Sequence, residues 1–329
     1  MVNETDAQAP SSKGGLLKQT PEDSVLIAPE NRDYERHLRT YVARHAGALF
    51  SNWDFDAASD PVEAIHDLRV ASRRLRALLE VLGFLVPEHV AQRRSLRKVT
   101  RGAGALREWD VNSQYLAEMV GRAASHLEAA ALEYVAVRVD EHRADERKAT
   151  AKRLSRLSPE RIQKGLHDLV EALVRAVLVA PLDELGRAAL EPRTEALLTS
   201  LPDAKADASG EHLHQVRIHI KRLRYAVELL APLLGEGYGS IHKQLKGLQQ
   251  DLGRHHDLFV LQGVLLAERD FLVAQGRKHL VMGLAGPLHH VAAEQRELAD
   301  AFLRGSESFD PDGFRQLMQD SLRGPAALR

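Results

Sequence analysis

The residues best suited to chemistry in this chain are histidine, arginine and lysine side chains that occur in two copies of one pattern. The segment 65–82 (IHDLRVASRRLRALLEVL) returns 148 residues later as 213–230 (LHQVRIHIKRLRYAVELL). Seven of its eighteen positions are identical, namely His66/His214, Arg69/Arg217, Arg74/Arg222, Leu75/Leu223, Arg76/Arg224, Glu80/Glu228 and Leu82/Leu230. At an eighth position, Arg73 and Lys221 keep the positive charge. One structural unit therefore occurs twice in the chain.

Helical geometry places these cations in a ridge. At about 100° per residue, three arginines of the first copy fall within roughly 80° of His66, and the leucines fall roughly 120–220° away. The first ridge consists of His66, Arg69, Arg73 and Arg76, and the second of His214, Arg217, Lys221 and Arg224. On the same wheel, Arg74 and Arg222 point away from the ridge. Each copy is thus expected to present an apolar face to a core and a basic ridge beside it.

The helix that follows each copy carries a second basic stripe. In the first copy Arg94, Arg97 and Arg101 share one face, and their counterparts in the second copy are Lys243, Lys246 and Gln250. Lys98 aligns with a glycine, so the stripe is weaker in the second copy. The further candidates are Arg107 and Arg254, which end the two basic segments.

Charge is segregated along a chain that is almost neutral overall. The net charge is −1, with 45 Lys and Arg against 46 Asp and Glu. The segment 65–107 has ten cations and three acids, a balance of +7, and 213–254 has seven cations and three acids, a balance of +4. Such a distribution favours a focused anion site over non-specific attraction to polyanions.

Charged helix faces are usually solvated surface, so the alternative interpretation is that these ridges bind no ligand. Like charges four residues apart cost about 0.2–0.5 kcal/mol per pair, and the Arg69–Arg73 step has no acid beside it on the ridge. The same ridge is also kept in both copies, whereas other surface positions differ. Arginine makes bidentate hydrogen bonds to phosphate oxygens. We therefore expect an extended, polyphosphate-like anion as the ligand.

Two points about the ridges stay open at this stage. Proteins that bind single-stranded nucleic acid stack bases on aromatic side chains, and the ridges carry no such row, which disfavours nucleic acid without removing it as an alternative. His66 and His214 either pack or cap their helices, or they become protonated when an anion binds. In the second case, binding strengthens as the pH falls toward about 6.

The rest of the chain predicts an all-α protein. Helix formers dominate, aromatic residues make up 5%, and no convincing alternating strand pattern occurs. Residues 1–30 are expected to form a flexible tail, and two pseudo-symmetric bundles of about four helices each, at 34–157 and 183–304, are expected to enclose a central basic channel. The expected helices are 34–50, 61–84, 88–106, 110–157, 159–178, 183–201, 211–234, 240–253, 257–274 and 277–304, with Asp60 and Pro61 as the start of the second.

These motifs resemble the CHAD family, the conserved histidine α-helical domain. That family carries a duplicated His–x–x–Arg–Val–x–x–x–Arg–Arg–x–Arg helix, followed by a turn of the pattern Gly–x–x–Arg–Asp–x–Asp–Val. The first turn here is Gly104, Arg107, Glu108, Asp110 and Val111, and the second is Gly253, His256, Asp257, Phe259 and Val260. The resemblance spans about 34–320, and the second copy departs from the pattern at Gln250, His256 and Phe259.

The resemblance implies two helical bundles around a channel that binds inorganic polyphosphate, with recruitment to polyphosphate or other storage granules. We expect a cytoplasmic binding protein without cofactor, metal or catalytic residues. The chain has no cysteine, no Gly-rich phosphate loop and no run of 18 apolar residues. We also expect no targeting segment. His66–Asp67 spells a dipeptide of metal-dependent phosphohydrolases, but the arginines around it disfavour a cation. A phosphohydrolase or another polyphosphate-metabolising enzyme remains the alternative function.

Overall fold

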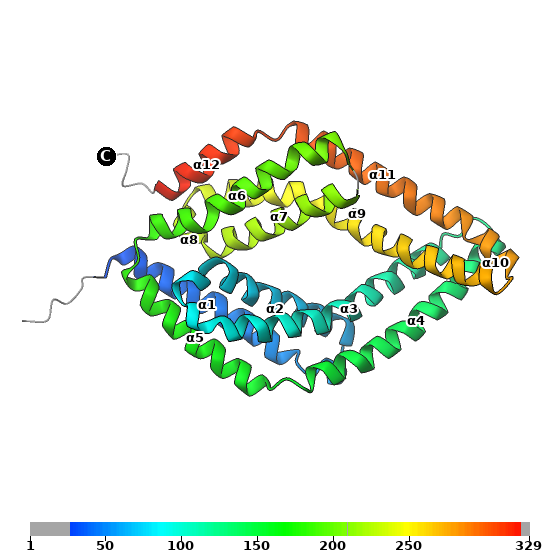
Figure 1. Cartoon of the computed structure of the whole chain (residues 1–329), viewed down its shortest axis with the longest axis horizontal. Helices are drawn as coiled ribbons and strands as arrows, with labels where there is room; N and C mark the ends of the chain where they lie inside the picture. The colour runs from blue at the N-terminus through cyan, green and yellow to red at the C-terminus, as the bar shows by residue number, and fades with distance from the viewer. Residues whose placement is uncertain (1–26, 209, 324–329) are drawn as a thin grey trace, which may run out of the picture.

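A computed structural model describes residues 27–208 and 210–323, and these fold entirely into helices and connecting turns (Figure 1). The α-helices are α1 Pro29–Ser51, α2 Pro61–Leu82, α3 Val90–Val120, α4 His126–Leu154, α5 Pro159–Val179, α6 Leu182–Ala206, α7 Gly210–Leu229, α8 Ala231–Leu234, α9 Gly237–Ala274, α10 Lys278–Gly283, α11 Ala285–Glu307 and α12 Pro311–Arg323. Short 3-10 helices cover η1 Phe55–Ala57, η2 Gly83–Leu85 and η3 Pro87–His89. The all-α prediction is confirmed. The predicted tail, 1–30, lies outside the described residues except for 27–30, within which α1 begins at Pro29.

The helices of the two halves make contacts in the same order. In the first half α2 packs between α1 and α3, and α3 packs against α4; in the second half α7 packs between α6 and α9, and α9 packs against α11. Figure 1 shows the first half along the lower side and the second half along the upper side of an elongated molecule. The halves meet where α2 contacts α7 and α3 contacts α9, and again at the far end, where α4 contacts α10. The exact two-bundle symmetry stays a prediction.

The start of α2 fixes where the first ridge begins. The Asp60 carboxylate accepts hydrogen bonds from the backbone N–H groups of Val62 (3.0 Å) and Glu63 (3.1 Å), and Pro61 occupies the first turn. A capping aspartate satisfies donors that the helix leaves free, and proline fits where no N–H is needed. The predicted start of this helix is therefore confirmed.

The apolar face of α2 is buried as predicted. Leu68, Leu75, Leu78 and Leu82 have no exposed surface, and they belong to a large core that also takes in the apolar face of α7. A second, smaller core at the far end joins the later turns of α3 and α9 to α4, α10 and α11. Burying a leucine side chain contributes about 1.5–3 kcal/mol, so these faces orient both ridges toward the boundary between the halves.

Two predicted helix breaks are wrong. Breaks were expected near 107–109 and 254–256, but α3 runs unbroken to Val120 and α9 to Ala274. A glycine that ends a helix usually adopts a positive φ, and the described glycines that do so are Gly235 and Gly276, not Gly104 or Gly253. The motif expected as a turn is thus helical in both halves. The expected helix 110–157 instead breaks at 121–125, before the Ser125 cap of α4.

Candidate functional site

Four ridge cations from the two halves lie together at the boundary between α2 and α7. We call Arg69 and Arg73 of α2 with Arg217 and Lys221 of α7 the central cluster; all four side chains are half-buried. Burial, followed by the charges of the three arginines, lowers the pKa of the Lys221 ammonium to about 6. Groups 148 residues apart in the sequence therefore act on one another electrostatically.

The central cluster has no close acidic partner. None of its four side chains forms an ion pair or a hydrogen bond with another described residue, and the Arg217 Nε is buried without a hydrogen-bond acceptor. Burial and the neighbouring cations also lower the pKa of Arg69 and of Arg217. Desolvated cations that repel one another raise the free energy of the folded protein. An anion that touches several of them at once offsets that cost.

Tyr225 lies among arginines of both halves. The guanidinium carbon of Arg74 is 4.5 Å from the centre of the Tyr225 ring, and those of Arg73 and Arg224 are each 5.7 Å from it. Cations above an aromatic face are attracted by its negative quadrupole. The ring thus helps to hold like charges close together. Sequence reasoning missed this role, because the first copy has a small residue, Ala77, at the corresponding position.

Two carboxylates stand near the central cluster at corresponding places on α3 and α9. Burial raises the pKa of Glu108 while Arg69 opposes the rise, and burial raises the pKa of Asp257 while Arg217 and Lys221 oppose it. Arg107 of α3 also acts on both Arg69 and Asp257. Counting Arg107, five basic groups face two acids here, so the local charge stays positive.

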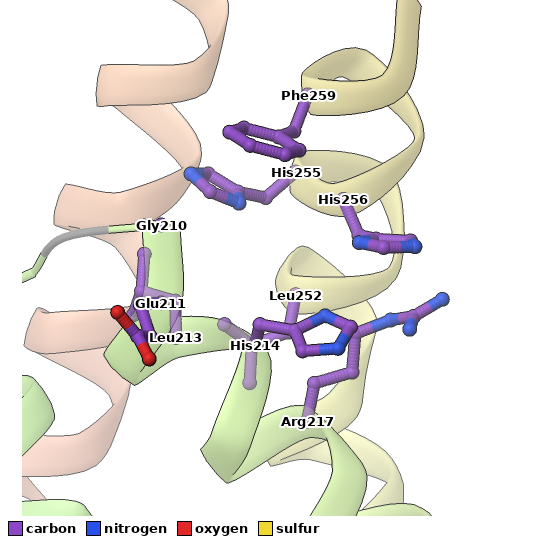
Figure 2. Close-up of a pocket in the computed structure, with 9 residues that line it drawn as sticks. All are labelled: Gly210, Glu211, Leu213, His214, Arg217, Leu252, His255, His256 and Phe259. Carbon is purple, nitrogen blue, oxygen red and sulfur yellow. The ribbon is translucent and has the colours of Figure 1, made fainter.

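The histidine of the second ridge borders a cavity of about 260 Å³ (Figure 2). The ring of His214 lies 5.0 Å from that of His256, centre to centre. Burial, and then the charge of Arg217, lowers the pKa of both rings, that of His256 to about 3. Both imidazoles are therefore neutral at neutral pH in the free protein. In the first half, the Nδ1 of His66 is buried without a hydrogen-bond partner.

Comparison with known proteins shows the family of the chain. The model of the CHAD domain family matches residues 38–266, which is more than half of the chain. The chain belongs to the CHAD family. Among solved structures, a CHAD domain from the plant Ricinus communis superposes with a TM-score of 0.61 at 22% identity, over 84% of this chain and 92% of that one. PptA from Streptomyces chartreusis superposes with a TM-score of 0.52 at 16% identity, over 88% and 99%. No curated protein matches.

The outer ends of the two CHAD ridges are neutralised within the protein. Arg76 pairs with Glu80 (3.2 Å), and Arg224 pairs with Glu228 (3.4 Å). Glu228 also pairs with Arg74 from the other half, and one of its oxygens lies 3.4 Å from the ring Nε2 of His242. Arg74, expected to point away from the ridge, thus points into the boundary and ties the halves together. Its counterpart Arg222 is exposed.

The stripe on the next CHAD helix of each half is exposed. Its members are Arg94, Arg97, Lys98 and Arg101 on α3, and Lys243, Lys246 and Gln250 on α9. None of them forms an ion pair or hydrogen bond with another described residue. Their part in a common channel stays a prediction.

Arg254 lies apart from the other candidates. It pairs with Glu294 (2.5 Å), and its guanidinium stands 5.5 Å from the Tyr115 ring centre. It lines a cavity of about 330 Å³ whose lining contains none of the central cluster. Here its charge holds α9 against α11.

One face of α2 has the spacing of a cation site. The ligand atoms of Glu63, His66 and Asp67 lie within 4.8 Å of one another. The expectation was that no metal binds near His66, because arginines surround it. Exposed acidic side chains often lie this close without an ion, and nothing else among the described residues points to one here. The described part of the chain has no helix of the length and apolarity needed to cross a bilayer.

Proposed function

We propose that this CHAD protein binds inorganic polyphosphate in the central cluster. It acts without catalysis, and binding recruits the protein to polyphosphate granules. The observation that carries the proposal is the set of four half-buried basic side chains, contributed by both halves, that have no ion pair in the described structure. Each internal phosphate of the polymer carries a negative charge and no base. Hydrogen bonds between arginine and phosphate are charge-assisted and bidentate, and so among the strongest available.

The arrangement favours a chain of phosphates over one phosphate ion. Arg69 and Arg73 lie one helical turn apart on α2, and Arg217 and Lys221 are spaced in the same way on α7. A ligand with several linked anionic groups reaches all four, and the exposed cations of α3 and α9 extend the positive surface. A duplex is a poor fit, since the cluster is half-buried between two packed helices.

The proposal is tested by retention of long-chain polyphosphate on immobilised protein. Reversing Arg73→Glu and Lys221→Glu together is expected to weaken retention at least about a hundredfold, because two charge-assisted contacts of about 1.5–3 kcal/mol each are lost. The matched control, Lys278→Glu with Arg304→Glu, makes the same change in net charge at exposed positions on α10 and α11. Far-UV circular dichroism checks that helicity is kept. Equal retention by the two variants would refute the proposal.

The rival functions are separated by two further measurements. Release of orthophosphate from polyphosphate in the presence of Mg²⁺ would identify a hydrolase, with Glu108 and Asp257 as the acids that act electrostatically on the cluster. Displacement of bound polyphosphate by duplex DNA at equal phosphate concentration would identify a nucleic-acid-binding protein. We expect neither result.

A further inference from the structure

The cavity beside the central cluster differs in chemistry from the cluster itself. It lies between the first turns of α7 and the middle of α9, and its apolar walls come from Leu213, Leu252 and Phe259 (Figure 2). The imidazoles of His214, His255 and His256 complete much of the lining, and burial lowers the pKa of all three. A space walled by apolar groups and neutral rings suits a flat aromatic group better than a phosphate.

Phe259 gives this cavity an aromatic platform. The residue is 54% exposed, although its ring lies against the start of α7: a Cβ built on Gly210 would stand 3.4 Å from Phe259 Cε2. The aligned residue of the first half is Asp110, which is buried and bonded to Arg143 at 2.6 Å. The duplicated position has thus changed from a structural carboxylate to an accessible aromatic ring.

Arg217 connects the cavity to the central cluster, because it belongs to both. Its buried Nε has no acceptor, and in Figure 2 its side chain lies beside the rings of His214 and His256. Glu211 also lines the cavity. A carboxylate repels phosphate but accepts hydrogen bonds from an exocyclic amino group. The cavity is therefore suited to a base, and the adjoining cluster to its phosphates.

We infer that the cavity binds the base of a nucleoside polyphosphate, stacked on Phe259, while its phosphate chain lies on Arg217 and the rest of the central cluster. This inference rests on the proposed function, since it uses the same cationic groups for the phosphates. One aromatic side chain at one end of the cluster can stack a single base, whereas proteins that bind single-stranded nucleic acid use several aromatic side chains for successive bases. The CHAD protein would then bind adenine- or guanine-bearing polyphosphates as well as inorganic chains.

The test compares ATP with tripolyphosphate by calorimetry on the full chain, in buffer containing a chelator. Stacking on an aromatic side chain is worth roughly fivefold or more in affinity. Phe259→Ala is therefore expected to weaken ATP binding at least about fivefold and to change tripolyphosphate binding less than about twofold. The control is Phe84→Ala, another exposed phenylalanine, on η2, which should change neither.

A second readout uses saturation-transfer NMR on the base protons of ATP. Transfer is expected in the wild type and in Phe84→Ala, and it should be weaker at the base protons in Phe259→Ala. Intact tripolyphosphate binding by Phe259→Ala shows that this variant is folded. If the wild type binds tripolyphosphate while Phe259→Ala leaves ATP affinity and saturation transfer unchanged, the inference fails and the proposed function stands. If the wild type binds neither tripolyphosphate nor long chains, the proposed function fails with it.

Discussion

Arginines at the centre and at the far end of this molecule have opposite surroundings. Toward the far end Arg143 pairs with Asp110 (2.6 Å) and Arg254 with Glu294 (2.5 Å), each joining two helices. At the centre, Arg69, Arg73 and Arg217 form no ion pair with a described residue. Paired charges hold helices together, whereas the central ones are kept close by the packing beneath them and, for Arg73, by the Tyr225 ring. The same residue type thus joins helices in one region and is left without an ion pair in the other, where we propose that it binds the ligand.

The largest expected difference between the two regions is in affinity for polyphosphate. Arg217→Gln removes a charge-assisted contact and should weaken binding about tenfold or more. Arg254→Gln removes a charge that Glu294 already neutralises, and should change binding less than about twofold. Titration of labelled polyphosphate with each variant measures both. Equal losses would show that overall charge, and not the central cluster, attracts the ligand.

The pH dependence of binding sharpens the comparison. In the free protein the pKa of Lys221 is about 6, lowered by burial and by Arg217, Arg73 and Arg69 and opposed by Asp257. Phosphate favours the charged ammonium and so raises this pKa. Below about pH 6 Lys221 is already charged, so affinity is at its plateau; above it, binding takes up a proton and affinity falls, by at most about tenfold per unit for one proton.

Calorimetry in two buffers of different ionisation enthalpy measures this proton uptake. At pH 7.5 we expect Lys221 to take up close to one proton when a long chain binds, because the internal phosphates of the chain do not titrate there. Lys221→Arg is charged before binding, so this uptake should be absent in that variant. His256 has a pKa of about 3 in the free protein. Any proton that it takes up depends on how far the bound ligand raises that pKa. Uptake that is the same in the wild type and in Lys221→Arg would contradict the assignment.

The stability of the free protein should respond in the opposite sense to binding. The folded pKa of Lys221 lies below its unfolded value of about 10.4, so between about pH 6 and 10.4 the unfolded chain binds more protons, and stability rises with pH. Lys221→Met removes the free-energy cost of burying an ionisable amine among arginines. It should raise the melting temperature at pH 7, by about 2–4 °C for each kcal/mol gained in the free energy of unfolding. Glu228→Gln weakens the link to Arg74 and should lower it. A drop in both variants would contradict an unfavourable central charge.

The smallest expected effects belong to the exposed stripes. Arg97→Gln on α3 and Lys246→Gln on α9 should each weaken polyphosphate binding less than about threefold, because exposed charges are screened by salt. Their contribution should vanish at high ionic strength, whereas that of Arg217 should persist. Affinity measured from low to high salt separates the two groups.

The sequence predicted the helical class, and a repeated pattern on a helical wheel indicated which side chains share a face of α2 and of α7; that both whole ridges and the stripes form one binding site stays a prediction. It did not predict the unbroken helices α3 and α9, since Gly104 and Gly253 indicate a break only if their φ is positive, which tertiary packing decides. The ion pairs of Arg74 and Arg254 join residues far apart in the chain, and no local pattern records them. The sequence did not predict the cavity beside Phe259; it showed only that Phe259 departs from the family motif.

A crystal structure with tripolyphosphate tests the central claim most directly. The account predicts one anion in contact with Arg69 or Arg73 of the first half and with Arg217 or Lys221 of the second half at the same time. Tripolyphosphate bound only along the exposed stripes of α3 and α9, with the central cluster untouched, would contradict it.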